Sequence, residues 1–573
     1  MRGSTAGTFR TISIYRFAIV CALFLSLGAG RAADQQPSLV LQAMHAELER
    51  SMQKLKTQPV SPYFLSYEIT ETHEFNVTGA FGKLTGSHES RHRQLDIDLR
   101  VGDYTMDNTR EIRGGMSGNP YANYVNIPVP IENDPDAIRA VLWYHTDERY
   151  KRAVEQFIKV KTNVQVKVAQ EDQSADFSRE EAQQHIEAPV DVKVDRGLWE
   201  DKIRRYTAPF AQYSSIYHAA AILTASAETR WYVNTEGSQI QTSQPAWHLF
   251  VIAYTKANDG MELPLYESFF GFTEKDLPDD ATVLKAVDRM IRDLEALRVA
   301  PLTDPYTGPA ILSGRASGVF FHEIFGHRVE GHRQKLANEA QTFKKMVNEQ
   351  VLPKDFSVYF DPTARRFAGT DLAGYYLYDN QGVKARRVDV VDNGVLKTFL
   401  MSRSPIEGFS QSNGHGRKQV GLSPVARQSN LIVEVAPSSV KPDLKTLLID
   451  EVKKQGLPFG LYFEDIQGGF TFTGRTIPNA FNVMPLVVYR IYPDGHEELV
   501  RGVDLIGTPL TTFSKIVAAD KNVAVFNGIC GAESGAVPVS AVSPGVLLSQ
   551  IEVQKKQKSQ ERPPVLPAPF EHR

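Results

Sequence analysis

The chain has 573 residues, of which 42% are apolar, 10% aromatic and 23% charged, and this composition excludes a disordered, collagen-like or fibrous protein. Lysine and arginine number 64 against 67 aspartates and glutamates. The chain therefore lacks the basic excess typical of nucleic-acid-binding proteins, and we expect no nucleic acid as a partner. A chain of this length is expected to form about two to four domains.

The first 33 residues have the pattern of a secretory signal peptide. Three arginines precede an apolar stretch over residues 17–27, and small residues follow as far as Ala32. The apolar stretch is shorter than the roughly 20 residues needed to span a membrane, so cleavage after Ala32 or Ala33 is favoured over a membrane anchor. We therefore expect an exported protein, periplasmic or secreted, with no stable membrane span once the signal is removed.

From there to residue 300 the sequence alternates between helical and strand patterns. Apolar residues that recur every three or four positions predict helices over residues 38–56, 135–160 and 278–298. Alternating patterns around glycine-containing turns predict strands over residues 63–101 and 215–256. The polar stretch 168–190 is interpreted as a solvated helix or a connector. We expect an N-terminal α+β domain over residues 34–300, with a polar connector at about 165–195.

The second half begins at a proline-rich junction, residues 301–309. After a strand over residues 309–314 we expect a helical stretch from Ala316 to Val347, then mostly strands and glycine turns to about residue 553. The fold class predicted is therefore α+β: a mixed N-terminal domain, then a strand-rich C-terminal domain over residues 301–553 whose main helix carries the candidate site. The charged tail 554–573 contains four prolines, and we expect it to be disordered.

The most informative stretch is SGVFFHEIFGHRVEGHRQ, residues 317–334, in which His322, Glu323 and His327 form a His-Glu-x-x-x-His pattern. Imidazoles are good zinc ligands, and a glutamate beside them can accept a proton from a water molecule at the metal. On a regular helix, side chains five positions apart point about 140° away from each other. The two histidines can therefore share an ion only if the helix is interrupted between them, as by a π-bulge, which Gly326 would ease.

A helix with incidental histidines is the alternative. Only 14 histidines occur in the chain, yet three of them lie within residues 322–332 among phenylalanines, where buried imidazoles need polar partners. This clustering favours a metal site. A catalytic zinc usually has three protein ligands, and the third could be the nearby Glu330 or His332, or the distant Cys530.

Cys530 would be the only cysteine of the exported chain, since Cys21 lies within the signal peptide. Gly528 and Gly531 flank Cys530 and predict a tight turn with an open backbone. A thiolate in such a turn could meet a metal ion. The alternative is a small buried apolar residue, which is the usual environment of a free cysteine.

Several motifs occur in order along this half: GPAILSGRASGVFFHEIFGHRVEG at 308–331, SNGHGR at 412–417, PVARQSN at 424–430 and NGICGAESGAVPVS at 527–540. Together they resemble the TldD/PmbA family of metallopeptidases, over roughly residues 215–553. The resemblance implies that His322, His327 and Cys530 bind one Zn²⁺ per chain and that Glu323 is the catalytic acid and base. It also implies a dimer, either of identical chains or with a related chain.

We therefore expect zinc-dependent hydrolysis of unfolded or extended peptides by a metal-activated water, with Glu323 as general base. His415 and Arg417, in a glycine-flanked loop, are candidates for contacts with the substrate or the oxyanion. Glu330 and His332 are candidates for the second shell of the metal. Two alternatives stay open: a non-enzymatic exported binding protein with a structural zinc closed by His332 or Glu330, and a hydrolase of a modified peptide or small molecule.

Overall fold

The computed structural model describes residues 37–112, 125–166, 172–475 and 481–556, together with residues 563, 564 and 566. The signal peptide expected at residues 1–33 and most of the tail expected at 554–573 lie outside these ranges. Among the helices of the described ranges, none is both long enough and apolar enough to cross a membrane.

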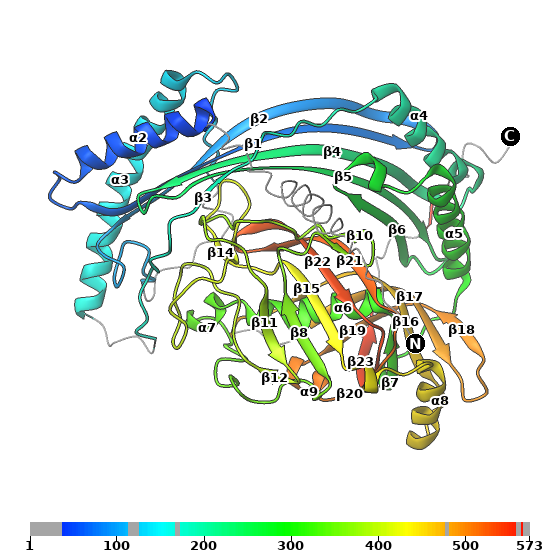
Figure 1. The fold of residues 1–573 in the computed structure, drawn as a ribbon. Helices are drawn as coiled ribbons and strands as arrows, with labels where there is room; N and C mark the ends of the chain where they lie inside the picture. Colours follow the sequence, from blue (N-terminus) through cyan, green and yellow to red (C-terminus); the bar gives the residue numbers. More distant parts are fainter. Residues whose placement is uncertain are drawn as a thin grey trace, which may run out of the picture.

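The N-terminal half is built around one long sheet, mostly antiparallel, which arches over the rest of the molecule (Figure 1). Its strand order is β2-β1-β4-β5-β3, with β6 beside β5. The pairs β1–β2 and β4–β5 are hairpins of strands 18 or 19 residues long, which confirms the strands predicted over residues 63–101 and 215–256. The bounds are β1 (Pro62–Ala80), β2 (Lys83–Val101), β3 (Gln184–Ile186), β4 (Ile216–Asn234), β5 (Gln239–Lys256) and β6 (Glu262–Gly271).

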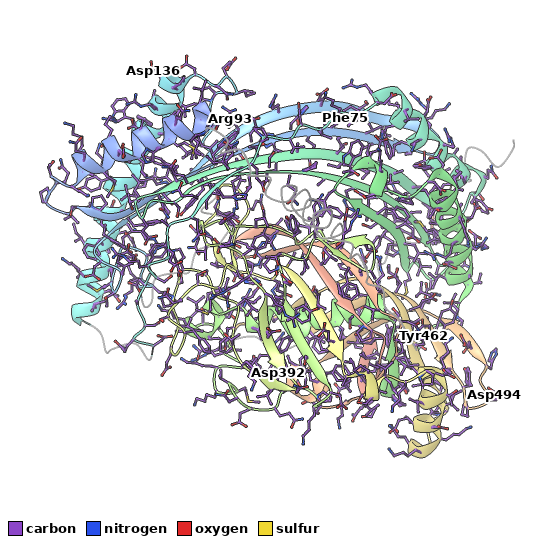
Figure 2. All side chains as sticks on the ribbon, viewed as in Figure 1. Phe75, Arg93, Asp136, Asp392, Tyr462 and Asp494 are labelled. Atoms are coloured by element: carbon purple, nitrogen blue, oxygen red, sulfur yellow. The ribbon has the colours of Figure 1, made fainter. Side chains whose placement is uncertain are left out.

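Helices pack at both ends of this sheet (Figure 1): α2 (Leu39–Leu55) and α3 (Pro135–Val166) at one end, α4 (Arg196–Thr207) and α5 (Asp280–Val299) at the other. The hydroxyl of Ser38 accepts a hydrogen bond from the backbone N–H of Leu41 at 3.3 Å, so α2 begins at its predicted cap. Phe75 lies on β1 (Figure 2). It belongs to the apolar core that includes Trp199 of α4. The helices α2, α3 and α5 confirm the three periodic segments, whereas α4 was not predicted.

The polar stretch 168–190 corrects one expectation. Its described part, residues 172–190, is extended and not helical, and β3 within it runs parallel to β5. Two carboxylates of this segment accept hydrogen bonds from backbone N–H groups. Asp172 accepts from the N–H of Ser174 at 2.8 Å, and Asp176 accepts from the N–H of Asp107 at 2.9 Å. Both aspartates are buried. The segment is therefore anchored to the protein by its polar side chains, which the sequence pattern alone attributed to a solvated face.

Buried ion pairs hold the arched sheet against the C-terminal half. Lys418 Nζ lies 2.8 Å from Glu68 Oε1 on β1 and also contacts Asp96 on β2. Arg403 Nη2 lies 2.7 Å from Glu236 Oε1. Because breaking a buried pair leaves an uncompensated charge, these contacts fix the position of the sheet relative to the site below it.

The C-terminal half is built mainly from two large sheets with a buried helix between them. The first sheet has the order β12-β11-β8-β15-β22-β21 and the second has the order β16-β7-β23-β19-β17-β18, with β20 beside β23. Because β16 also pairs with β17, five strands of the second sheet close into a ring. The strands of the first sheet are β8 (Phe356–Phe360), β11 (Val388–Asp392), β12 (Val395–Leu396), β15 (Asn430–Val435), β21 (Ala524–Ala532) and β22 (Gly535–Ser543). Those of the second are β7 (Tyr306–Leu312), β16 (Gly460–Thr471), β17 (Phe481–Ile491), β18 (Glu497–Val500), β19 (Val503–Gly507), β20 (Ile516–Ala519) and β23 (Val546–Lys555).

The central helix of this half is α6 (Gly314–Ile324), which contacts β16 of one sheet and β21 and β22 of the other. Other helices are η4 (Gly326–Val329), α7 (His332–Lys335), α8 (Leu444–Gln455) and α9 (Pro509–Phe513). The α+β class and the strand-rich C-terminal region are therefore confirmed.

The helix predicted from Ala316 to Val347 is much shorter in the structure, because α6 ends at Ile324. The chain continues in the short helices η4 and α7, and between them it bonds to another segment. The N–H of Gly331 donates to the carbonyl of Leu400 at 2.8 Å, and the N–H of Leu400 donates to the carbonyl of Val329 at 2.9 Å.

Candidate metal centre

Helix α6 is held close to the first sheet by its glycines. Its N-terminus is capped by Ser313, whose hydroxyl accepts from the N–H of Ala316 at 3.2 Å. A Cβ on Gly318 would lie 3.2 Å from the carbonyl oxygen of Ala541 on β22, and one on Gly314 would lie 2.8 Å from that of Ser543. The small residues at these positions therefore let the helix approach the strand that lies beside β21.

The helix is interrupted between the two histidines, as the spacing predicted. His322 lies in the last turn of α6 and His327 in the 3₁₀ helix η4. The interruption is a helix end and not a π-bulge. Arg328 Nη1 donates to the carbonyl oxygens of Glu323 and Ile324, at 3.2 Å each, and so satisfies groups that lose helical partners there.

Gly326 is needed at this interruption for space. A Cβ at this position would overlap the side-chain amide of Gln428, and Gln428 Nε2 donates to the carbonyl oxygen of His322 at 3.2 Å. The same amide therefore packs against Gly326 and binds the last turn of α6.

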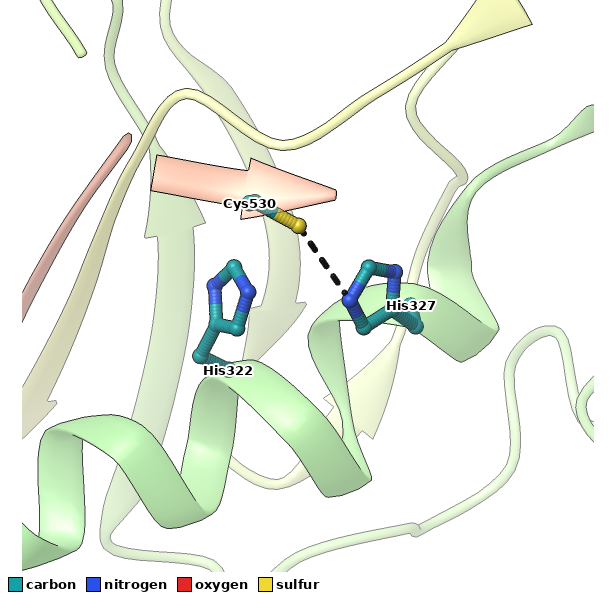
Figure 3. A group of neighbouring side chains, drawn as sticks. All are labelled: His322, His327 and Cys530. Atoms are coloured by element: carbon teal, nitrogen blue, oxygen red, sulfur yellow. Dashed lines mark hydrogen bonds between the residues drawn. The ribbon is translucent and has the colours of Figure 1, made fainter. Parts of the chain in front are cut away.

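The structure brings His322, His327 and Cys530 together (Figure 3). One side-chain donor atom from each lies within 4.8 Å of the other two. Cys530 Sγ is 3.3 Å from His327 Nε2. The centroids of the two imidazole rings are 5.1 Å apart and the rings are inclined by 77°. All three side chains are buried.

Cys530 lies on a strand, which corrects the prediction of a tight turn. It pairs with Val537 across the β21–β22 hairpin, whose turn comes only after Ala532. A Cβ on Gly528 would lie 2.7 Å from the ring of Phe526, so the glycine leaves room for that ring. The cysteine is therefore presented by a paired strand, a more rigid support than a loop.

The environment of the Cys530 thiol favours its ionised form. Burial alone would raise the pKa of the thiol, but the adjacent imidazoles of His327 and His322 hold the pKa well below its usual value. Arg427 adds a donor, with Nη2 lying 2.8 Å from the Cys530 carbonyl oxygen and 3.3 Å from Sγ. This arginine is buried and was given no role in the sequence analysis, although it lies in the PVARQSN motif.

Two glutamates lie on different sides of His327. Glu323 Oε2 is 3.9 Å from its Nε2 and borders the same pocket, as expected for a group that acts beside the metal. Glu330 Oε2 is 3.2 Å from its Nδ1, and Arg333 also donates to Glu330 at 2.9 Å. Burial alone would raise the pKa of Glu330, but His327 and Arg333 lower it to about 2. Glu330 is thus placed to orient the His327 ring through its Nδ1, on the side away from Cys530.

His332 belongs to a second group, with Glu330 and Glu533. Its Nε2 contacts Glu533. Arg333 donates to both glutamates of this group, at 2.9 Å to Glu330 and 2.7 Å to Glu533. Because a guanidinium already neutralises these carboxylates, we interpret the group as an ion-pair network that supports the segment after η4.

His415 and Arg417 have structural partners behind the site. His415 Nε2 is 3.1 Å from Ser429 Oγ, and Arg417 donates to the carbonyl oxygen of Gln428 with its guanidinium over the ring of Tyr376. Burial lowers the pKa of His415 to about 3 and that of Arg417 to about 10. Within the described part of the chain, neither borders the pocket at the candidate ligands, so the structure gives no support to their role in binding the substrate or the oxyanion.

The pocket at the three candidate ligands has a volume of about 470 Å³. Residues 467–474, at the end of β16, form one wall, and β21 residues between 526 and 532 form the other. A sulfur and two imidazole nitrogens are donors that suit zinc, and three protein donors are the usual number at a catalytic site. The donor set in this pocket therefore fits a catalytic zinc ion.

Comparison with known proteins agrees with this geometry. A family model described as the PmbA/TldA metallopeptidase C-terminal domain matches residues 305–555, the region that holds both sheets and α6. Residues 305–555 therefore form a domain of the TldD/PmbA family. The two histidines and the cysteine thus lie within the domain that the family shares.

Relatives of this chain are named as metalloproteases. One from Archaeoglobus fulgidus is 30% identical over 237 residues, which are 41% of this chain and 51% of the relative. A zinc metalloprotease TldD homolog of Saccharolobus solfataricus is 24% identical over 252 residues, which are 43% of this chain and 51% of the relative. The matches thus span about half the length of these two relatives.

The fold extends beyond the region of sequence similarity. The crystal structure of TldE from Thermococcus kodakarensis superposes with a TM-score of 0.58 at 12% identity, over 89% of this chain and 100% of that one. The likeness therefore reaches well beyond residues 305–555.

Proposed function

We propose that this chain is a zinc-dependent peptidase that cleaves unfolded or extended peptides. In this proposal His322, His327 and Cys530 hold one zinc ion, and Glu323 is the general base. The observation that carries the proposal is the convergence of two imidazoles and a thiol in one pocket that the Glu323 carboxylate also borders. The metalloprotease names of its relatives support the same reaction class.

When bound, the zinc ion would polarise the scissile carbonyl and make water a nucleophile at neutral pH. Glu323 would accept a proton from the attacking water and deliver it to the leaving amine. Glu330 would keep the His327 ring turned so that Nε2 faces the cysteine, through the 3.2 Å contact with Nδ1. Arg328 donates to the carbonyl oxygens at the end of α6 and would thereby keep His322 and Glu323 in fixed positions beside the metal.

An extended peptide suits the shape of the site. Among the strands of the described residues, β21 is the terminal strand of the first sheet and pairs with β22 on one side only. A peptide could therefore bind along its outer edge by β-augmentation, through backbone hydrogen bonds that do not depend on sequence.

The proposal includes export and a dimer. The signal-peptide pattern of residues 1–33 supports a periplasmic or secreted protein, and the family supports a homodimer or a heterodimer with a related chain. Amino-terminal sequencing of the protein recovered outside the cytoplasm tests the first point, and light scattering at micromolar concentration tests the second. A start at Met1, or a monomer, would contradict the respective statement.

The competing function is a binding protein with a structural zinc, which would need a fourth protein donor. The two nearby candidates have other partners, since Glu330 bonds to Arg333 and His332 contacts Glu533.

The experiment is hydrolysis of an unfolded protein by the zinc-loaded chain, by the chain after chelation, and by Glu323→Gln. We expect Glu323→Gln to keep its zinc and to lose about 10²- to 10⁴-fold in rate. Zinc binding without hydrolysis by the unaltered chain would favour the structural role, and unchanged turnover in Glu323→Gln would exclude Glu323 as the base.

A further inference from the structure

Two exposed aromatic side chains border the candidate metal pocket. Phe470 is 42% exposed and Phe472 is 41% exposed, and both line the pocket together with His322, His327 and Cys530. Exposed aromatic rings in a concave site commonly mark ligand contacts. We infer that Phe470 and Phe472 form a subsite that binds a large apolar side chain of the peptide, an inference that rests on the proposed peptidase function and assigns its side-chain preference.

The two rings act as one surface with a fixed position. They lie two residues apart at the end of β16, and their centroids are 5.3 Å apart in an edge-to-face arrangement. Between them, Thr471 Oγ1 accepts a hydrogen bond from Arg328 Nη1 at 2.6 Å. Because Arg328 also binds the carbonyl oxygens of Glu323 and Ile324, one buried side chain supports both the aromatic pair and the end of the metal-binding helix.

The rest of the pocket favours an apolar side chain over a charged one. Within the described part of the chain, the carboxylate and guanidinium groups that line it belong to Glu323, Arg333 and Glu533, of which Arg333 and Glu533 pair at 2.7 Å. A charged side chain of the peptide would lose its hydration in this pocket. Among these charged groups, only Glu323, the proposed base, would be free to pair with it. Further apolar lining comes from Val319, Phe526 and Val539.

The first test measures where the full-length, zinc-loaded chain cuts unfolded peptides, with the products identified by mass spectrometry. We expect kcat/KM for bonds beside Phe, Tyr or Leu to exceed that for bonds beside Ser or Asp by at least about 10-fold. The double variant Phe470→Ala/Phe472→Ala should lose most of this preference at unchanged zinc content, whereas Phe470→Leu/Phe472→Leu should keep most of it. Leu510→Ala is the matched control, since Leu510 is also 41% exposed but does not line this pocket.

The second test does not depend on hydrolysis. Calorimetric titration of zinc-loaded Glu323→Gln with eight-residue peptides of glycine and serine, carrying a central Phe or Asp, compares the two Kd values. We expect the Phe peptide to bind at least about 10-fold more tightly, and the added double substitution to abolish the difference. Equal Kd values, or a preference that survives the double substitution, would overturn the subsite. A chain that shows the preference but hydrolyses no peptide would overturn the proposed function and leave the subsite standing.

Discussion

The sulfur of Cys530 lies 3.3 Å from Nε2 of His327, although 203 residues separate the two along the chain. The contact joins the end of a helix to the edge strand of a sheet. It brings together a soft thiolate donor and an imidazole nitrogen, the combination that selects zinc over the hard divalent cations. In the proposed site, Cys530 would therefore favour zinc as the ion and set the spacing of the candidate ligands.

The first prediction is that Cys530→Ser loses most of its zinc, because a neutral hydroxyl is a far poorer ligand than a thiolate. Native mass spectrometry of the purified chain gives the occupancy. Ser534→Ala is the control, since Ser534 Oγ accepts from Arg427 at 2.8 Å without belonging to the candidate ligands, and it should keep its zinc. Full occupancy in Cys530→Ser would remove this residue from the site.

The second prediction concerns Glu330, which we expect to act on the metal only through His327. Glu330→Gln should weaken zinc binding by about 10- to 100-fold, because the neutral amide orients and polarises the imidazole less well. Competition with a chromophoric chelator gives the Kd. Glu339→Gln is the matched control, since Glu339 also pairs with Arg333, at 3.1 Å, but has no contact with His327 in the described structure. If Glu330→Gln and Glu339→Gln bind zinc with equal affinity, Glu330 contributes only to the ion-pair network and not to the orientation of His327.

The local part of this site could be predicted from the sequence, because its geometry follows from spacing. His322, Glu323 and His327 lie within one helical turn and a half, so the angle between them on a regular helix could be calculated, and the interruption followed. The contribution of Cys530 could not be derived in this way, because no local pattern sets the distance between residues so far apart. It came from the resemblance to a family, and the structure now shows the convergence.

The errors in prediction have physical causes of the same kind. Gly528 and Gly531 suggested a turn at Cys530, but β22 provides a partner strand that keeps the segment extended. The helical stretch expected as far as Val347 is interrupted between η4 and α7, because Leu400 pairs with the chain on both sides of Glu330. In both cases the backbone forms hydrogen bonds with a segment distant in the sequence, which local periodicity cannot predict.

The third prediction tests the close approach at Gly326. Gly326→Ala should lower the free energy of unfolding by about 1–3 kcal/mol and weaken zinc binding, because its Cβ would overlap the Gln428 amide that holds the last turn of α6. Adding Gln428→Ala should restore part of both losses, which a double-mutant cycle measures. Gly474→Ala is the control, since the nearest atom to its Cβ would be the Asn338 carbonyl oxygen at 3.7 Å. If Gly326→Ala and Gln428→Ala change the stability additively, the overlap between the new Cβ and the Gln428 amide is not the cause of the loss.

The last prediction is a pH dependence of stability that His415 produces. Burial lowers its pKa in the folded protein to about 3, whereas an unfolded chain has a histidine pKa of about 6.5. The unfolded state therefore binds this proton first, and the free energy of unfolding falls as the pH drops below about 6.5, by up to about 1.4 kcal/mol per pH unit. Between pH 7.5 and pH 5 the loss should reach about 2 kcal/mol.

Denaturant unfolding of the metal-free chain at pH 7.5, 6 and 5 measures this slope. His415→Gln should be less stable at pH 7.5, because the new side chain must replace the hydrogen bond to Ser429. It should nevertheless lose less stability on acidification than the unaltered chain, because one proton uptake on unfolding is removed. Substitution of the exposed His496 by glutamine should leave the slope unchanged. A His415→Gln chain with the same slope as the unaltered chain would mean that His415 has the same pKa in the folded and unfolded states, which would contradict the effect of burial.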